Sequence, residues 1–470
     1  MFPIISAMLV IPIVGFVLIA LLKERMSKGI AVASTAIVFA LTLGLLIYSI
    51  TTGNANLSES YSYISSFGIG LSFRLGIIPL ILLFMSSIVL LATALSGNHE
   101  NSRPRAANML IMLFQIASIG LFTSANFFMF FIFWDIGVIA MFFMINVLGS
   151  ANRRQASIKF LIYELLASAL LLLAILMIYF YTPVHSFDIA YITSNIAMIP
   201  ANVQGAIFAL LFIAFMINMP LFPLHHWLPD AHTEASTQGS MLLSGILTKY
   251  GGFGMILLFG MMPVSHSWAS YIALLAAFST FYAVFLLMRQ TDVKRIIAYS
   301  TIVEMGIVMF GITALNSLGT YGAVYAMLSH GLVVALMFLA VGSLKHLFGE
   351  RDINILRGTV LNAKATTYTF LIGTLAMVGF PLSAGFIADI LIFLGTLQSF
   401  GLLGLIPLGA LILLGSYMYF VINRSMLATR EHSRNVDYIG MQQRIGYAFL
   451  MFFIFLFGVL PFLLLNLVKL

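Results

Sequence analysis

The stretch of sequence that decides the fold reads PLHHWLPDAHTEASTQGSMLLSGILTKYG, from Pro223 to Gly251. The apolar run before it ends at Pro220, and Pro223 follows three residues later. A proline inside an apolar helix removes a backbone hydrogen bond and frees a carbonyl. Titratable side chains gather after the prolines, and Lys249 lies inside the next apolar run. The stretch therefore predicts two apolar helices separated by a polar break.

The composition of the whole chain is that of a membrane protein. Of 470 residues, 61% are hydrophobic and 8% are charged, and the mean hydropathy is +1.08. A soluble domain is about 45–50% apolar and about 25% charged, so a soluble enzyme, a nucleic-acid binder and a disordered chain are excluded. The chain has no cysteine, which excludes disulfides, Fe–S clusters and cysteine zinc sites within it. The hydrophobic residues suffice for roughly 14 spans of about 20 residues and leave no room for a soluble domain.

Apolar runs predict an all-α polytopic protein with about 14 transmembrane helices. They lie at 3–22, 29–50, 76–96, 107–123, 125–148, 157–181, 205–223, 237–261, 267–288, 294–313, 320–344, 368–396, 401–422 and 445–467. The first run has no charged residue before it, so it is interpreted as a retained helix and not as a cleaved signal peptide.

The positive charges predict the orientation. Of 22 Lys and Arg residues, 19 follow odd-numbered spans, which is the pattern expected if those loops face the cytoplasm. Both termini are then outside, in the cytoplasmic membrane of a bacterium or an archaeon. The net charge of +7 is interpreted as this loop bias and not as a nucleic-acid site. Arg153, Arg154, Lys294 and Arg295 are interpreted as orientation and headgroup charges.

The few ionisable residues inside the spans carry the functional information. Such a side chain in the hydrocarbon core costs at least ~2.5–3.5 kcal/mol on insertion scales, so it usually marks an ion or proton path. Acids, a lysine and histidines can each exchange a proton, and together they predict a proton relay. The candidates inside spans are Asp135, Glu164, Lys249, Glu304, His330 and Asp389, and those between spans 7 and 8 are His225, His226, Asp230, His232 and Glu234.

Two spans are interrupted at matching positions. Pro220 and Pro223 break span 7, and Gly379-Phe380-Pro381 breaks span 12. Because the breaks lie five spans apart, and five is odd, they predict two inverted five-helix repeats, spans 4–8 and 9–13. The expected regions are 1–106, with three helices and an outer loop at 51–75, a first repeat at 107–261, a second repeat at 262–425 and a C-terminal helix at 426–470. The polar, partly alternating residues 51–73 predict a small hairpin.

From Pro223 to Gly251 the chain resembles the antiporter-like proton-channel subunits of respiratory complex I, and most closely the chain-M type. Relatives of these subunits occur in Mrp-type sodium/proton antiporters and membrane-bound hydrogenases. Further matches follow in order through spans 5 to 12, at Phe133-Trp134-Asp135, Arg153-Arg154, Ile158-Lys159-Phe160, Asp292 to Ser300, Ser329-His330-Gly331, Gly379-Phe380-Pro381 and Gly385-Phe386. The resemblance implies 14 helices with inverted repeats and a proton path along the membrane mid-plane.

The resemblance also implies roles for single residues. Asp135 lies where the family has its span-5 acid, and Lys249 lies at the central span-8 lysine. His330 matches the span-11 histidine, and Asp389 lies at the span-12 position that faces the outer exit. These groups would load and relay protons, without covalent chemistry in this chain. The segment between spans 7 and 8 would hydrate the central path instead of binding a metal, through His225, His226, His232 and Glu234.

The chain departs from the family pattern at a paired charge. Lysine usually precedes the Met-Pro of span 7 and pairs with the span-5 acid, but here the residue is Asn218, which cannot change charge. Glu164 is an additional span-6 acid, and Glu304 stands near a position that is often histidine. One hypothesis is that Lys249 pairs directly with Asp135 or Glu164 and bypasses position 218. The opposing hypothesis is that the channel is degenerate and the subunit no longer pumps.

Three functions follow from this resemblance. The first is a proton-translocating subunit of a complex I-like oxidoreductase that uses NADH, ferredoxin or F420H2 and a quinone. The second is a subunit of an Mrp-type Na+/H+ antiporter, and the third is a non-pumping structural subunit of a hydrogenase or carbon-uptake complex, which Asn218 favours. Quinone, Fe–S and flavin groups are expected in partner subunits, and no cofactor or metal in this chain. The expected partners are other membrane subunits and the bilayer, with an internal position in the assembly because the chain ends soon after span 14.

Overall fold

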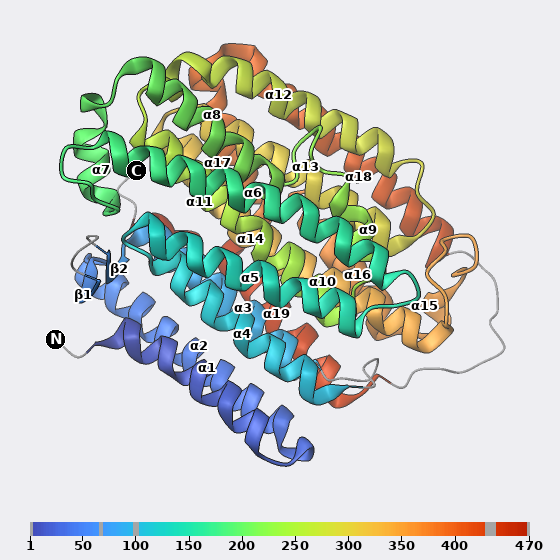
Figure 1. Ribbon diagram of the computed structural model, residues 1–470. Helices are drawn as coiled ribbons and strands as arrows, with labels where there is room; N and C mark the ends of the chain where they lie inside the picture. The colour runs from blue at the N-terminus through green and yellow to red at the C-terminus, as the bar shows by residue number, and fades with distance from the viewer. Residues whose placement is uncertain (1–2, 65–68, 97–102, 428–438, 468–470) are drawn as a thin grey trace.

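The computed structural model describes residues 3–64, 69–96, 103–427 and 439–467, which form one bundle of long, roughly aligned helices (Figure 1). In chain order the helices are α1 (Ile4–Leu21), α2 (Ser27–Thr52), α3 (Ile77–Leu95), α4 (Pro104–Thr123), α5 (Phe127–Leu148), α6 (Arg153–Tyr181), α7 (Ile189–Asn195), α8 (Ala201–Asn218), α9 (Trp227–Glu234), α10 (Thr237–Leu242), α11 (Thr248–Met261), α12 (Val264–Leu287), α13 (Val293–Thr313), α14 (Ser317–Phe348), α15 (Thr359–Asn362), α16 (Lys364–Met377), α17 (Ala384–Phe400), α18 (Ile406–Ser425), α19 (Met441–Val459) and α20 (Phe462–Leu465).

The helices confirm the predicted all-α polytopic architecture. Thirteen stretches of the described residues are long and apolar enough to cross a membrane. One of them, Ala384–Ser425, has 42 residues and would be about 63 Å long as a single helix. That is twice the roughly 30 Å hydrocarbon core, and the 3-10 turn η5 (Gly401–Leu405) divides it into α17 and α18. Counted as two passes, these helices bring the number to the predicted 14.

The predicted hairpin is present next to the N-terminal helices. Strand β1 (Leu57–Ile64) pairs with β2 (Ile69–Leu75) in an antiparallel ladder that places Leu57 opposite Leu75. The hairpin, α7 and the start of α1 lie at the left of Figure 1, whereas the α5–α6 turn and α15 lie at the right. Three of the basic residues used to predict orientation, Arg430, Arg434 and Lys469, lie outside the described residues.

Both predicted helix breaks are confirmed. Helix α8 ends at Asn218, and residues 219–226, with Pro220 and Pro223, form irregular turns before α9 begins. Residues 378–383, with Pro381, separate α16 from α17 in the same way. Gly379 has φ +70°, a left-handed conformation that favours glycine, and a Cβ there would collide with the Asp389 carboxylate.

A third irregularity was not predicted from the sequence. Between α10 and α11 the chain forms one π-turn, η4 (Leu243–Leu247), and Lys249 follows two residues later. The carbonyl of Ser244 accepts hydrogen bonds from the Thr248 hydroxyl, at 3.0 Å, and from the Lys249 ammonium. Such π-turns are rare in proteins, and those that occur are often found at functional sites.

Two further departures from the sequence prediction are the short helix α7 and the start of the seventh span, which begins at residue 201 instead of 205.

Helices α13 and α14 form the centre of the bundle. Their apolar windows are entirely buried, whereas those of α1, α2 and α6 are 33–39% buried. Helix α14 packs against α17, α13, α16, α19 and α3, so it contacts helices from both the N-terminal and the C-terminal regions of the chain. The large exposed side chains on the outer helices are mainly apolar, as expected of a surface that faces lipid or other membrane subunits. Ionisable groups on α11, α13 and α14 are therefore held in the interior.

Candidate functional site

Lys249 is the centre of a buried polar network. Its side chain is fully buried, and its ammonium donates to the Ser244 carbonyl and to Thr248 Oγ1, at 3.3 Å. The third contact is His330 Nδ1 on α14, at 2.6 Å. An ammonium has three donors and no acceptor, so these contacts use all three. A charged Lys249 requires a neutral His330 that accepts at Nδ1, and a proton can pass directly between the two groups.

A second histidine joins this network through a serine. His232 Nε2, on α9, lies 2.7 Å from the hydroxyl of Ser244. The same hydroxyl lies 3.0 Å from Thr301 Oγ1 on α13. Ser244 therefore contacts His232 through its hydroxyl and Lys249 through its carbonyl. The His232 ring stacks on Phe338, with ring centroids 4.6 Å apart.

On the other side of His330 the network reaches two acids. Glu304 on α13, His330 and Asp389 on α17 line one small pocket together with Ser329 and several small side chains. His330 Nε2 has no hydrogen-bond partner among the described residues. The pocket therefore brings one histidine and two carboxyl groups from three helices to a shared cavity, through which protons can be exchanged.

Glu164 and Asn218 form a separate network in the first half of the chain. Asn218 Nδ2 lies 3.2 and 3.4 Å from the two carboxyl oxygens of Glu164 on α6, and its Oδ1 accepts from the backbone N–H of Gly251 at 2.8 Å. Both side chains are fully buried. Asp135 on α5 accepts from Ser168, which lies one turn after Glu164 on α6. The two acids of the first half thus lie at neighbouring turns of α6, Glu164 as part of that helix and Asp135 through its bond to Ser168.

The hypothesis that Lys249 pairs with Asp135 or Glu164 is wrong in this structure. Every hydrogen bond of the Lys249 ammonium goes to η4, to Thr248 or to His330, and none of the ion pairs among the described residues includes it. The reason is the phase of α11. Gly251 lies two residues after Lys249 and therefore about 200° further around the helix. Gly251 faces Asn218, so Lys249 faces the opposite side.

Four of the five candidates of the polar break separate into two groups. His232 and His225 are buried, and neither ring nitrogen of His225 has a partner among the described residues. His226 is exposed, with Nδ1 3.0 Å from the Pro223 carbonyl oxygen. Glu234 lies at the edge of the bundle, where its carboxylate accepts from Ser150 and Asn152 of the α5–α6 turn. The last two are therefore placed away from the buried network.

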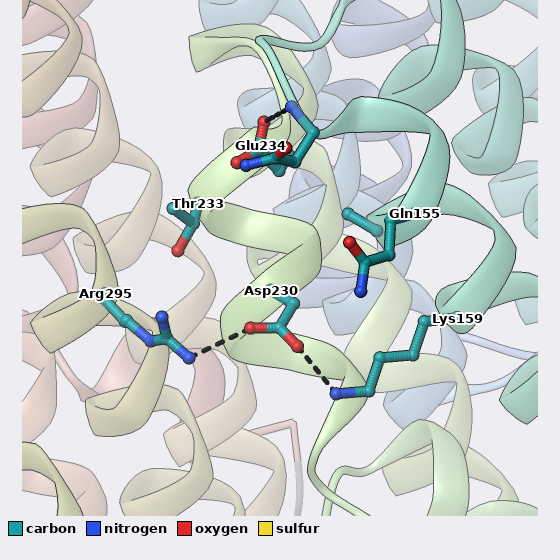
Figure 2. A pocket seen from close by; sticks show the side chains of 8 residues that line it. Gln155, Lys159, Asp230, Thr233, Glu234 and Arg295 are labelled. Atoms are coloured by element: carbon teal, nitrogen blue, oxygen red, sulfur yellow. Dashed lines mark hydrogen bonds and ion pairs between the residues drawn. The ribbon is translucent and has the colours of Figure 1, made fainter.

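An ion cluster holds the outer face of α9 (Figure 2). Asp230 lies 2.7 Å from the ammonium of Lys159 on α6 and 3.0 Å from the guanidinium of Arg295 on α13. Gln155, Thr233 and neighbouring side chains complete the open pocket around it. Since α6 and α13 belong to different halves of the chain, Asp230 ties both halves to the short helix that carries His232.

Two more basic residues bind the carboxyl end of α9. The buried ammonium of Lys294 donates to the Ala235 carbonyl, and Arg351 donates to the Thr233 carbonyl at 3.0 Å and pairs with Asp292 at 3.1 Å. The interpretation of Lys294 and Arg295 as headgroup charges is therefore wrong. A loop-end lysine gives the same sequence signal whether it points outward to lipid or inward to a helix end.

Sequence reasoning also missed the hydroxyl groups that connect the ionisable residues. Ser168 bonds to Asp135, Ser244 contacts both His232 and Lys249, and Thr301 bonds to Ser244. The sequence did contain a signal for these hydroxyl groups, because each lies three to five residues from Glu164, Lys249 or Glu304 and so close to it along the chain.

Within the described ranges, no three His, Cys, Asp or Glu side chains lie close enough together to hold a metal ion.

Many aligned apolar helices, two broken ones and a buried row of lysine, histidine and carboxyl groups define a polytopic membrane protein of the antiporter-like class. Residues 124–412 match the family described as NADH:quinone oxidoreductase/Mrp antiporter, TM, and the chain belongs to this family.

Relatives and solved structures extend this match over the whole chain. The chain is 32% identical over 480 residues to NADH-quinone oxidoreductase subunit M of Rickettsia bellii. This match covers 99% of this chain and 96% of that protein. It is 31% identical over 474 residues to F(420)H(2) dehydrogenase subunit M of Methanosarcina mazei, covering 98% and 95%. A chain of respiratory complex I from Thermus thermophilus has the same fold, with a TM-score of 0.90, 23% identity and coverage of 99% and 98%.

Proposed function

We propose that this chain is a proton-translocating membrane subunit of a complex I-like oxidoreductase, in which other subunits transfer electrons from NADH, ferredoxin or F420H2 to a quinone. The observation that carries the proposal is the contact between Lys249 and His330, 2.6 Å apart in the interior of the bundle and linked through Ser244 to His232. A buried charge without a carboxylate partner is costly, and membrane proteins retain such groups where protons or ions move. Membership of a family whose relatives include subunits M of two such dehydrogenases supports the same conclusion.

In this proposal Lys249 is the proton-loading group. His330, in direct contact, exchanges protons with it, and Glu304 and Asp389 carry the proton from His330 towards the outer surface. His232 lies beside this path, at the Ser244 hydroxyl. Asp135, Glu164 and Asn218 belong to the other half of the path and meet α11 through the backbone of Gly251. His225 lines the break in the seventh span, and the exposed positions of His226 and Glu234 favour supporting roles.

We further propose that the two halves are inverted repeats, at 107–261 and 262–425. Each half contains one broken helix, α8–α9 in the first and α16–α17 in the second. In both halves, long uninterrupted helices come earlier in the chain than the broken one. The regions 1–106 and 426–470 would flank the repeats. An odd number of passes per repeat requires the second to have the opposite orientation, as in many transporters.

The expected setting is a cytoplasmic membrane with both termini outside. The partners are other membrane subunits, and flavin, Fe–S clusters and quinone lie in those partners. The test is mass spectrometry of the proteins that co-purify from native membranes in mild detergent. Redox subunits with Fe–S or flavin groups would support the proposal, and small membrane chains alone would support the Mrp-type Na+/H+ antiporter instead.

A proton-flux assay on the reconstituted assembly tests the relay itself. Lys249→Met removes the group that gains and loses the proton, so we expect proton translocation to fall at least tenfold while the assembly stays intact. Lys345→Met, a change of the same kind at the end of α14, is the matched control and should keep translocation near that of the unchanged protein. Equal translocation by both variants would refute the role of Lys249.

Asn218 is the specific observation in favour of a non-pumping structural subunit, because it cannot change charge. Asn218→Lys restores the residue usual in the family. Increased proton translocation in this variant would support a path weakened at position 218. Complete absence of translocation from both the unchanged protein and the variant would favour the structural role.

A further inference from the structure

An open pocket lies at the positively charged end of the bundle, where α4 begins and α5 turns into α6. Arg103, Arg153 and Arg154 line it, together with Asn146 and the backbone of residues 149–151. All three arginines are exposed, and none forms an ion pair with another described residue. Arg153 donates only to the Gly149 carbonyl, at 3.2 Å. Among the described residues, the pocket therefore presents three positive charges without a negative partner.

The nearby acids do not compensate for these charges. The carboxylate of Glu234 accepts from Ser150 and Asn152, both at 2.9 Å, and lines the neighbouring pocket on the other side of the turn. Asp230 is shared between Lys159 and Arg295. Both of these described acids thus have their own partners.

An apolar strip continues from the arginines along α6. A second open pocket shares Arg154 with the first and extends over Ile158 and Ile162, which are 42% and 62% exposed. Leu165 and Leu166, 52% and 49% exposed, follow on the same face of the helix. From Ile158 to Leu166 the helix rises about 12 Å, close to half of the roughly 30 Å hydrocarbon core. Exposed apolar side chains continue further along α6 at Leu173 and Phe180, so the strip is long enough to hold an acyl chain.

We propose that this place binds one anionic phospholipid. The phosphate would lie among Arg103, Arg153 and Arg154, and an acyl chain would lie along Ile158, Ile162 and Leu166. Guanidinium groups suit phosphate because their planar N–H groups bind its oxygens in pairs. Basic pockets between transmembrane helices at the cytoplasmic side bind acidic headgroups, and the length of the strip favours a lipid over a free phosphate.

Native mass spectrometry of the full chain, in the assembly from which it is extracted, tests this proposal. The probes are phosphatidylglycerol, phosphatidylcholine with the same acyl chains, and glycerol 3-phosphate. We expect one phosphatidylglycerol to be retained where phosphatidylcholine and glycerol 3-phosphate are not. The triple variant R103Q/R153Q/R154Q should weaken this retention at least tenfold, and the milder R154Q by several-fold.

The control variant K23Q/R25Q/R289Q removes three exposed charges from other loops of the same end and should retain the lipid like the unchanged protein. Equal loss in this control would mean that net charge alone attracts lipid, and would overturn the proposal. Equal retention of phosphatidylcholine, or displacement of the lipid by glycerol 3-phosphate, would also overturn it. A photo-crosslinker that replaces Ala151 tests whether a protein partner occupies the pocket instead of a lipid. Crosslinking to a protein partner would identify the pocket as a subunit interface and overturn the proposal.

Discussion

The residue at position 218 connects two helices in a way that a lysine cannot. Asn218 donates to Glu164 and accepts from the N–H of Gly251, so it uses both ends of its amide. A lysine has three donors and no acceptor. Its ammonium could pair with Glu164 but would leave the Gly251 N–H without that acceptor. Asparagine at this position therefore exchanges a mobile charge for a neutral bridge between α6, α8 and α11.

Asn218→Ala should destabilise the protein. The change removes the hydrogen-bond donor of the buried Glu164 carboxyl, and an unsatisfied buried polar group costs about 1–3 kcal/mol. We expect a clear fall in the apparent melting temperature of the detergent-solubilised chain. Asn423→Ala, at an exposed asparagine of α18, should leave it unchanged. Equal melting temperatures for both variants would mean that the bridge contributes nothing.

At the scale of elements, the short helix α9 joins the two halves of the molecule. It has eight residues, too few to be stable alone, and its outer face and carboxyl end are bound by Lys159, Lys294, Arg295 and Arg351. The sequence predicted the break before α9 because proline has a local effect on the backbone. It could not predict which basic residues bind α9, since they come from α6, α13 and the loop after α14, far from α9 in the chain.

Asp230→Asn should loosen α9 with little effect on the rest of the bundle. The two ion pairs are about one-third exposed, so their loss should cost no more than about 1 kcal/mol of global stability. Locally, hydrogen exchange of the α9 amides should become faster, whereas α13 and α14 stay protected. Glu24→Gln, at an exposed acid outside the ion pairs, should leave the exchange of α9 unchanged. Unchanged exchange in Asp230→Asn would show that hydrogen bonds alone hold α9.

For the whole molecule, the spans were predictable because each needs only about 20 apolar residues in sequence, a property that neighbours in space do not change. Which side chains meet depends instead on helix phase and packing. Lys249 and Gly251 are two residues apart yet belong to different networks, and the π-turn before them shifts the phase of α11. The contacts of Lys249 with Ser244 and His330 therefore follow from the folded bundle and not from any local pattern.

The orientation of the bundle can be tested directly because the chain has no cysteine of its own. Ser58 in the hairpin and Ala151 in the α5–α6 turn are both exposed, and Ala298 in α13 is buried. If loops after odd-numbered spans face the cytoplasm, a membrane-impermeant maleimide should label Ser58→Cys in intact cells, and Ala151→Cys only after permeabilisation. Ala298→Cys should stay unlabelled until the protein is denatured, which controls for access. Labelling of Ala151→Cys but not Ser58→Cys in intact cells would reverse the orientation, and the pocket of Arg103, Arg153 and Arg154 would then face the outer leaflet.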